Sequence, residues 1–157
     1  MMYIRVLFFT LSTCARLFSQ DLFTTGIPSN IYFTPTAVAA ADFNKDGIMD
    51  IVVGGKNDLD GQGIISILYG KGDGTFKNKI DMPADKYPVD IQVVDIDNDG
   101  FPDIVTCNSA AQTVTIFINQ KSSFKAKDPI KIKGEPGAVG VGDFNKDGKL
   151  DLAVLVG

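Results

Sequence analysis

Short apolar runs rich in β-branched residues alternate with polar, glycine-containing segments along most of the chain. Runs of this length and composition are typical of β-strands. Helical periodicity is absent beyond the N-terminal segment, so the pattern predicts an all-β fold. In the first part of the chain we expect four strands, at residues 36–41, 48–54, 64–69 and 76–82.

The pattern repeats with a period of 53 and then 48 residues, measured between Pro35, Pro88 and Pro136. Repeats of this length, with about four short strands each, are typical of β-propeller blades built from four-stranded antiparallel units. We therefore expect repeat 1 at residues 36–87, repeat 2 at 88–135 and a partial repeat 3 at 136–157. Residues 20–35 would form an N-terminal segment or, through Ile-Tyr-Phe at 31–33, a strand of a neighbouring blade.

One acidic nine-residue loop occurs in each repeat, at residues 42–50, 95–103 and 143–151. Oxygen-bearing side chains at positions 1, 3, 5 and 9, with a backbone carbonyl at position 7, suit a bound Ca²⁺ ion. A glycine at position 6 permits the sharp turn that such a loop requires. We expect about three Ca²⁺ ions, with ligands Asp42, Asn44, Asp46, Ile48 and Asp50 in the first loop, Asp95, Asp97, Asp99, Phe101 and Asp103 in the second, and Asp143, Asn145, Asp147, Lys149 and Asp151 in the third.

Other interpretations of the loop fit less well. An EF-hand requires a bidentate Glu at position 12 and flanking helices, but the twelfth residues are Val53, Thr106 and Val154 within β-branched runs. Mg²⁺ seldom uses an all-protein cage, and a zinc or copper site has no ligands in a chain without His and with two Cys. A plain Asp-Gly hairpin turn is the simplest alternative, but three copies that keep the ninth Asp favour calcium.

These residues resemble the FG-GAP/VCBS repeat family, the calcium-loop blades of integrin α-subunit heads and many secreted bacterial proteins. The resemblance covers the chain from about residue 30 onward; it rests on Pro-x₆-Asp-Phe-Asn-x-Asp-Gly-x-x-Asp and on Gly-x-Gly-Asp-Gly-Thr-Phe at 70–76. It implies a β-propeller, usually of about seven blades, with calcium between the first two strands of each blade. Because the chain holds about two and a half such blades, we expect a truncated product, a fragment, or assembly with other chains.

The charge balance follows from the loops. Acidic residues outnumber basic ones by 19 to 15, and ten of the 19 are predicted ligands, so the excess is not a diffuse acidic surface. Three bound Ca²⁺ ions would change the formal charge from −4 to about +2. The Lys residues are scattered without a basic run, which argues against nucleic-acid binding.

The N-terminus predicts export. Residues 1–19 have the outline of a signal peptide: Arg5, an apolar stretch at 6–11, and cleavage after Ala15 or Ser19; a hydrophobic outer strand is the alternative. Leu-Ser-Thr-Cys at 11–14 is similar to a lipoprotein box with an atypical Thr, so anchoring at Cys14 is a second alternative. The stretch is too short for a transmembrane helix, which leaves a secreted or cell-surface protein. Cys107 would be a small core residue.

The function that we expect is a secreted or cell-surface calcium-binding adhesion or interaction module. Its partner would be an extracellular protein or a glycan, and open blade edges would favour self-association. Catalysis is not expected, since no His is present and the carboxylates are assigned to metal. A carbohydrate-binding module is one alternative, with Tyr69 and Tyr87 as stacking residues in a chain without Trp. The other is a non-catalytic fragment of a larger propeller enzyme such as a polysaccharide lyase.

Overall fold

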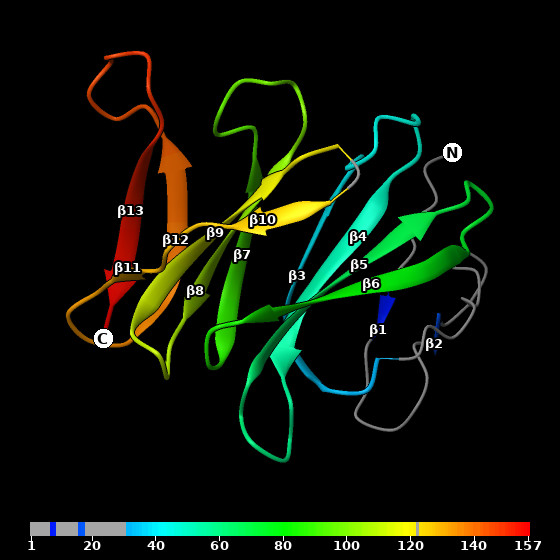
Figure 1. Ribbon diagram of the computed structural model, residues 1–157, viewed down its shortest axis with the longest axis horizontal. Coiled ribbons are helices and arrows are strands. Elements are labelled where there is room, and N and C mark those ends of the chain that lie inside the picture. The colour runs from blue at the N-terminus through cyan, green and yellow to red at the C-terminus, as the bar shows by residue number, and fades with distance from the viewer. Residues whose placement is uncertain (1–6, 9–15, 18–30, 122) are drawn as a thin grey trace.

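The protein is described from a computed structural model at residues 7–8, 16–17, 31–121 and 123–157. Every regular element in that part of the chain is a β-strand (Figure 1), which confirms the predicted all-β class there. β1 (Leu7–Phe8) and β2 (Arg16–Leu17) pair with each other in antiparallel fashion. The remainder of the predicted signal peptide, including Cys14 and both expected cleavage points, lies outside the described residues.

The first sheet contains four strands in chain order, each antiparallel to the next: β3 (Thr34–Ala41), β4 (Asp50–Lys56), β5 (Gly63–Gly70) and β6 (Phe76–Ala84). The four predicted strands coincide with these to within two residues at each end. β4 begins later than expected because Ile48 still belongs to the acidic loop, where its N–H donates to the Asp46 carboxylate. Of the two interpretations of residues 20–35, the one with a strand at 31–33 does not match the structure, because these three residues form no strand. Instead Phe33 is buried against Val53 and Leu68 on one face of the sheet.

The second sheet repeats this order with β7 (Pro88–Val94), β8 (Asp103–Asn108) and β9 (Thr113–Asn119). Its fourth strand is divided into β10 (Phe124–Ala126) and β11 (Ile130–Lys131), which pair with opposite ends of β9. Pro129 lies between the two pieces and has no N–H to offer to the ladder. The outer strand of this sheet is therefore shorter and less regular than β6.

The third unit is a hairpin of β12 (Pro136–Gly142) and β13 (Asp151–Val156). In all three units the first strand starts at or just before the repeated proline, and its register shifts directly after it. The shifts fall between Pro35 and Ala37, Pro88 and Asp90, and Pro136 and Ala138. The repeat is thus a repeat of backbone irregularities as well as of sequence.

The first strands of the three units lie innermost. β3 is next to β7, and β7 is next to β12 (Figure 1). β3 is rich in alanine, and Ala37, Ala39 and Ala41 pack against the core between the first two sheets. Small side chains let these inner strands approach one another.

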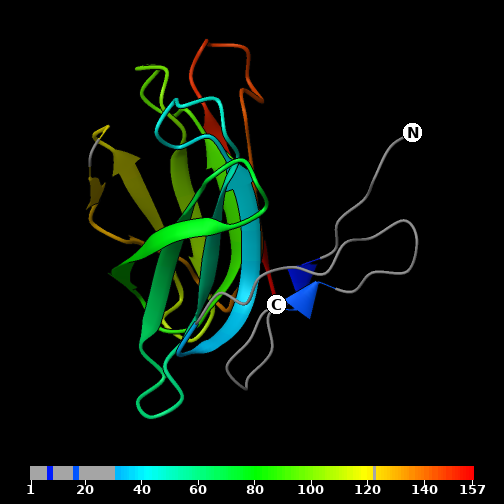
Figure 2. The ribbon, with the colours of Figure 1, turned by 90° about the vertical axis from the view of Figure 1, so that its right-hand side faces the viewer.

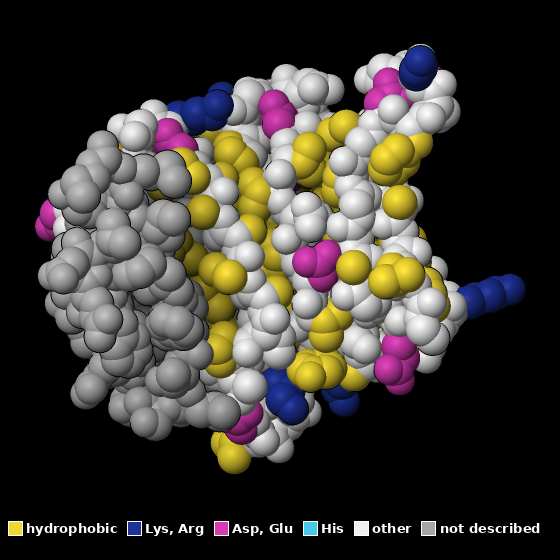
Figure 3. Space-filling model, turned by 180° about the vertical axis from the view of Figure 1, so that it is seen from behind, with side chains coloured by type: hydrophobic (Ala, Val, Ile, Leu, Met, Phe, Trp, Pro, Cys, Tyr) yellow, Lys and Arg dark blue, Asp and Glu magenta, His cyan; other side chains and the backbone are white. Residues whose placement is uncertain are grey.

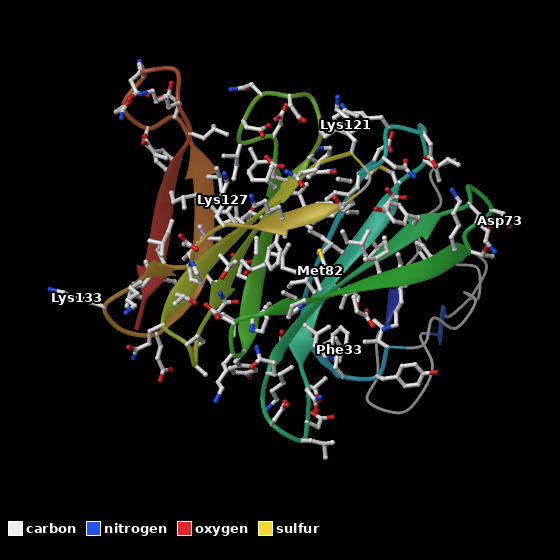
Figure 4. All side chains as sticks on the ribbon, in the orientation of Figure 1. Phe33, Asp73, Met82, Lys121, Lys127 and Lys133 are labelled. Atoms are coloured by element: carbon white, nitrogen blue, oxygen red, sulfur yellow. The ribbon has the colours of Figure 1, made fainter. Side chains whose placement is uncertain are left out.

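Two of the hydrophobic cores are each shared by two units. The core between the two sheets takes Val52, Ile65 and Ile67 from the first and Ile104 and Phe117 from the second. Met82 of β6 points into this region (Figure 4). The second core joins the second sheet to the hairpin, through Val105, Cys107, Val114 and Val139. A unit therefore buries its apolar faces by stacking on its neighbours, as in other repeat proteins.

Candidate metal centres

The three acidic loops occupy the same place in each unit. Each joins the first strand to the second, and all three emerge at the same end of the molecule, uppermost in Figures 1 and 2. The structure brings the predicted side chains of one loop together within that loop. It does not merge the three loops into one site.

The loop backbones have the same conformation in all three copies. Position 4 has a positive φ of 61°, 58° and 63° at Lys45, Asn98 and Lys146, and the glycine at position 6 has φ near 82–88°. A Cβ atom at Gly47, Gly100 or Gly148 would meet nothing within 4 Å. Glycine is therefore required there for its backbone conformation and not for lack of space.

Main-chain amides hold the ligand side chains in place. In the first loop the two carboxylate oxygens of Asp42 accept the N–H groups of Asp46 and Gly47 at 3.1 and 2.8 Å. Asn44 Oδ1 accepts the same Asp46 N–H at 2.9 Å, and Asp46 Oδ1 accepts the Ile48 N–H at 2.9 Å. The equivalent bonds recur in the other two loops. These side-chain-to-backbone turns fix the side chains at positions 1, 3 and 5 within each loop.

The second loop carries the densest negative charge. One carboxylate oxygen each from Asp95, Asp97 and Asp99 lies within 4.8 Å of the other two. In the other loops the middle member is an amide, Asn44 or Asn145. The donor set is oxygen only, and it includes no soft ligand, which fits a hard cation such as Ca²⁺. Carboxylates held this close repel one another unless a cation lies among them.

The ninth residue has a structural role that the sequence did not predict. Asp50 and Asp103 are fully buried, and each bridges its own loop to the end of the third strand. Asp50 accepts the N–H groups of Phe43 and Gly70, both at 2.9 Å. Asp103 accepts those of Ile96 at 2.8 Å and Asn119 at 2.7 Å. Burial raises the pKa of both carboxyl groups, and the amide hydrogen bonds oppose that shift.

The third loop is less enclosed. Asp151 accepts one N–H, from Phe144 at 3.1 Å, and the Phe144 ring is 63% exposed, whereas its counterpart Phe43 is 1% exposed. Figure 3 shows this loop at the upper right, projecting from the body of the molecule. The carbonyl ligands predicted at Ile48, Phe101 and Lys149 stay predictions.

A lysine flanks the first loop. Lys77 Nζ of β6 lies 3.4 Å from Asp46 Oδ2. The pKa of Asp46 is lowered, chiefly by the hydrogen bond from the Ile48 N–H, with smaller contributions from Asn44 and Lys77. This carboxylate is therefore ionised at neutral pH. A cation that binds it would compete with the Lys77 ammonium group.

Asn119 lies at the same end of the molecule as the acidic loops, and the sequence did not predict its role there. It ends β9, is 2% exposed, and donates from Nδ2 to the carbonyl oxygens of Phe43 at 2.8 Å and Pro102 at 3.1 Å. Its own Oδ1 accepts the Lys121 N–H at 2.9 Å. The link joins residues 76 apart in sequence, so no local motif marks it.

The thiol of Cys107 is not available for nucleophilic chemistry. Cys107 lies in β8 at 0% exposure, as expected of a small core residue. Burial raises its pKa to about 11, with a smaller contribution from the charge of Asp90. A buried neutral thiol of this kind is unreactive. A hollow of about 340 Å³ lies beside the first loop, lined by Ile48, Gly72, Gly74 and Phe76 among others, and has no titratable side chain in its lining.

Repeated antiparallel units, each with an acidic loop between its first two strands, define a repeat protein of the β-propeller type. The profile of the FG-GAP-like repeat matches residues 42–106 and again 95–154. The chain belongs to the FG-GAP-like repeat family, and its units have the form of that family's propeller blades.

A similarity to one characterised protein points the same way. Integrin alpha-6 of Gallus gallus is 32% identical over 85 residues, an alignment that covers 45% of this chain and 8% of the integrin. Among the described residues, none lies in a helix that is long and apolar enough to cross a membrane.

Proposed function

We propose that the chain is a non-catalytic, integrin-like propeller module of the cell exterior, with one structural Ca²⁺ ion in each acidic loop. In this proposal the metal stabilises the blades, and the surface they display binds an extracellular protein or glycan. The observation that carries the proposal is the threefold recurrence of the same loop conformation, in which main-chain amides hold oxygen-bearing side chains. A single cluster of exposed carboxylates would have little weight, but three with matching dihedral angles and hydrogen bonds point to a shared ligand.

Each loop would bind the ion through the side chains at positions 1, 3 and 5, supported by the ninth carboxylate and the seventh carbonyl. The main-chain amides use one lone pair of each carboxylate oxygen that they reach, and a second remains for the metal. Ca²⁺ accepts six to eight oxygen ligands, so water completes the shell. Such an ion would neutralise the repulsion within the loop and tie the innermost strand of a blade to the second.

The interaction role is supported by the similarity to integrin alpha-6 and by the shape of the third unit. β13 pairs with β12 on one side and with no other strand among the described residues. Leu155, on this strand, is 69% exposed. A strand with an unpaired edge and exposed apolar side chains favours pairing with a second chain. We therefore include self-association through β13 in the proposal.

Calcium titration of the full chain tests the metal assignment. Calorimetry should give about three binding events, with Ca²⁺ preferred over Mg²⁺. Ca²⁺ should also raise the melting temperature above that in EDTA, because the sites exist only in the folded state. A matched pair of variants isolates the loops: Asp99→Ala should lose one event, whereas Asp128→Ala removes the same charge from an exposed position outside the loops and should lose none. Equal melting temperatures in EDTA and in millimolar Ca²⁺ would refute the proposal.

A further inference from the structure

The first and second acidic loops are connected through a buried asparagine. The Asn119 side chain donates to the Phe43 carbonyl, which lies between the predicted ligands Asp42 and Asn44. The Asn119 main-chain N–H donates to Asp103, the ninth residue of the second loop. One residue therefore touches the backbone of one loop and a ligand side chain of the other.

Aromatic contacts reinforce this connection. Two ammonium groups lie over the Phe101 ring of the second loop, with Lys45 Nζ of the first loop 5.8 Å and Lys121 Nζ 5.5 Å from its centroid. Figure 4 shows Lys121 at the upper end, between the two loops. On the buried side, the rings of Phe43 and Phe124 meet edge to face at 5.8 Å. Both cation–π and edge-to-face contacts of this kind are stabilising.

The third loop provides an internal contrast. All hydrogen bonds of residues 143–151 within the described structure stay inside the hairpin of β12 and β13. The second residue of this loop is the exposed Phe144. Its counterpart in the first loop, Phe43, is buried, accepts a hydrogen bond from Asn119 and packs against Phe124. Any coupling through Asn119 is therefore confined to the first two loops.

We propose that Asn119 couples cation binding at residues 42–50 to cation binding at residues 95–103, and that residues 143–151 bind independently. This inference rests on the proposed function and specifies how two of its sites communicate. An ion in the second loop would order Asp103, which fixes Asn119, which in turn holds the Phe43 carbonyl and the first loop in their bound arrangement. Binding at one loop then removes part of the ordering cost at the other, which is positive cooperativity without a change of fold.

The test follows each site separately by NMR during a Ca²⁺ titration of the full chain. The amide signals of Gly47, Gly100 and Gly148 report on the three loops, since each N–H is bonded to the first carboxylate of its own loop. Asp99→Ala disables the second loop and should lower the affinity of the first by about fivefold or more, the usual lower range for coupled sites. Asp147→Ala disables the third loop and should leave the first unchanged.

Asn119→Gly, combined with Asp99→Ala, completes a double-mutant cycle. Gly70 occupies the equivalent position in the first sheet and provides the same main-chain bond to Asp50, so this variant keeps the bond to Asp103 and removes only the side chain. In the Asn119→Gly background, Asp99→Ala should no longer affect the first loop. Asn108→Ala removes another buried asparagine of the same sheet, at the end away from the loops, and should preserve the coupling.

The outcomes separate the two proposals. If no glycine signal moves at millimolar Ca²⁺, the proposed function is wrong and the coupling falls with it. If the signals move but Asp99→Ala and Asp147→Ala affect the first loop equally, the metal sites stand and the coupling is refuted. The latter comparison uses chains that retain Asn119, so it decides whether the first two loops are coupled even if Asn119→Gly fails to fold.

Discussion

Removal of the Asp103 carboxylate should be among the most destabilising single changes in the chain, even without metal. The side chain is fully buried and accepts two main-chain amides, one from its own loop and one from the end of β9. Asp103→Ala leaves both N–H groups without a partner. A hydrogen bond to a charged group contributes about 1.5–3 kcal/mol, so the two together amount to about 3–6 kcal/mol.

The cost of burying the charge reduces this figure. The pKa of Asp103 is raised by burial, which means that the folded state disfavours the ionised form relative to water. We therefore expect a loss near the lower limit, about 3 kcal/mol, out of a typical domain stability of about 5–15 kcal/mol. Asp103→Asn keeps the volume and one acceptor oxygen but turns an NH₂ group toward the other amide, so its loss should be intermediate.

The measurement is urea unfolding followed by circular dichroism, in EDTA so that the missing metal ligand has no effect. Asp151→Ala is the matched control, because Asp151 occupies the same loop position but accepts a single amide at 3.1 Å in a partly exposed hairpin. Its loss should be about 1 kcal/mol. If both variants lost the same stability in EDTA, the two-amide bridge would not be the source of the effect.

Four further predictions concern three separate parts of the molecule. Lys77→Ala removes the ammonium group 3.4 Å from Asp46 and should raise the Ca²⁺ affinity of the first loop about two- to fivefold. If the Gly47 amide signal had the same titration midpoint in this variant as in the wild type, the prediction would be wrong. Cys107, with a pKa of about 11, is neutral at about pH 8 and should resist a thiol reagent until urea unfolds the chain. Raising the pH from the ordinary thiol pKa toward 11 should also lower stability, since the unfolded state ionises first. Leu155→Lys on the exposed edge of β13 should reduce concentration-dependent association in light scattering, and a monodisperse wild-type monomer would refute self-association.

Much of the fold could be predicted because the repeat encodes it locally. The β-branched runs, the prolines and the acidic loops all lie within a few residues of the features they specify. The strands of the first sheet were thus placed to within two residues. One exception is also local in cause, since the fourth strand of the second unit is divided around Pro129. The other is not: residues 31–33 form no strand, and Phe33 is buried against Val53 and Leu68, which are distant in sequence.

The support behind the loops could not be predicted in the same way. Asp50 and Asp103 were expected to bind metal, and their spacing alone gives no sign that they also connect to Gly70 and Asn119. Asn119 reaches Phe43 only after the two sheets have stacked. Such a contact depends on the relative position of two units, which the sequence pattern within either unit does not contain.

Shared cores have a consequence for synthesis on the ribosome. Every strand pair in the first sheet joins neighbours in sequence, so its hydrogen bonds are able to form once Ala84 has emerged. Its inner face, however, is covered by Ile104 and Phe117, which are made later. The nascent first unit must therefore expose Val52, Ile65 and Ile67 until β9 is complete. This interval is when the growing chain is most open to misfolding or capture by a chaperone, and slow translation between Pro88 and Asn119 should lengthen it.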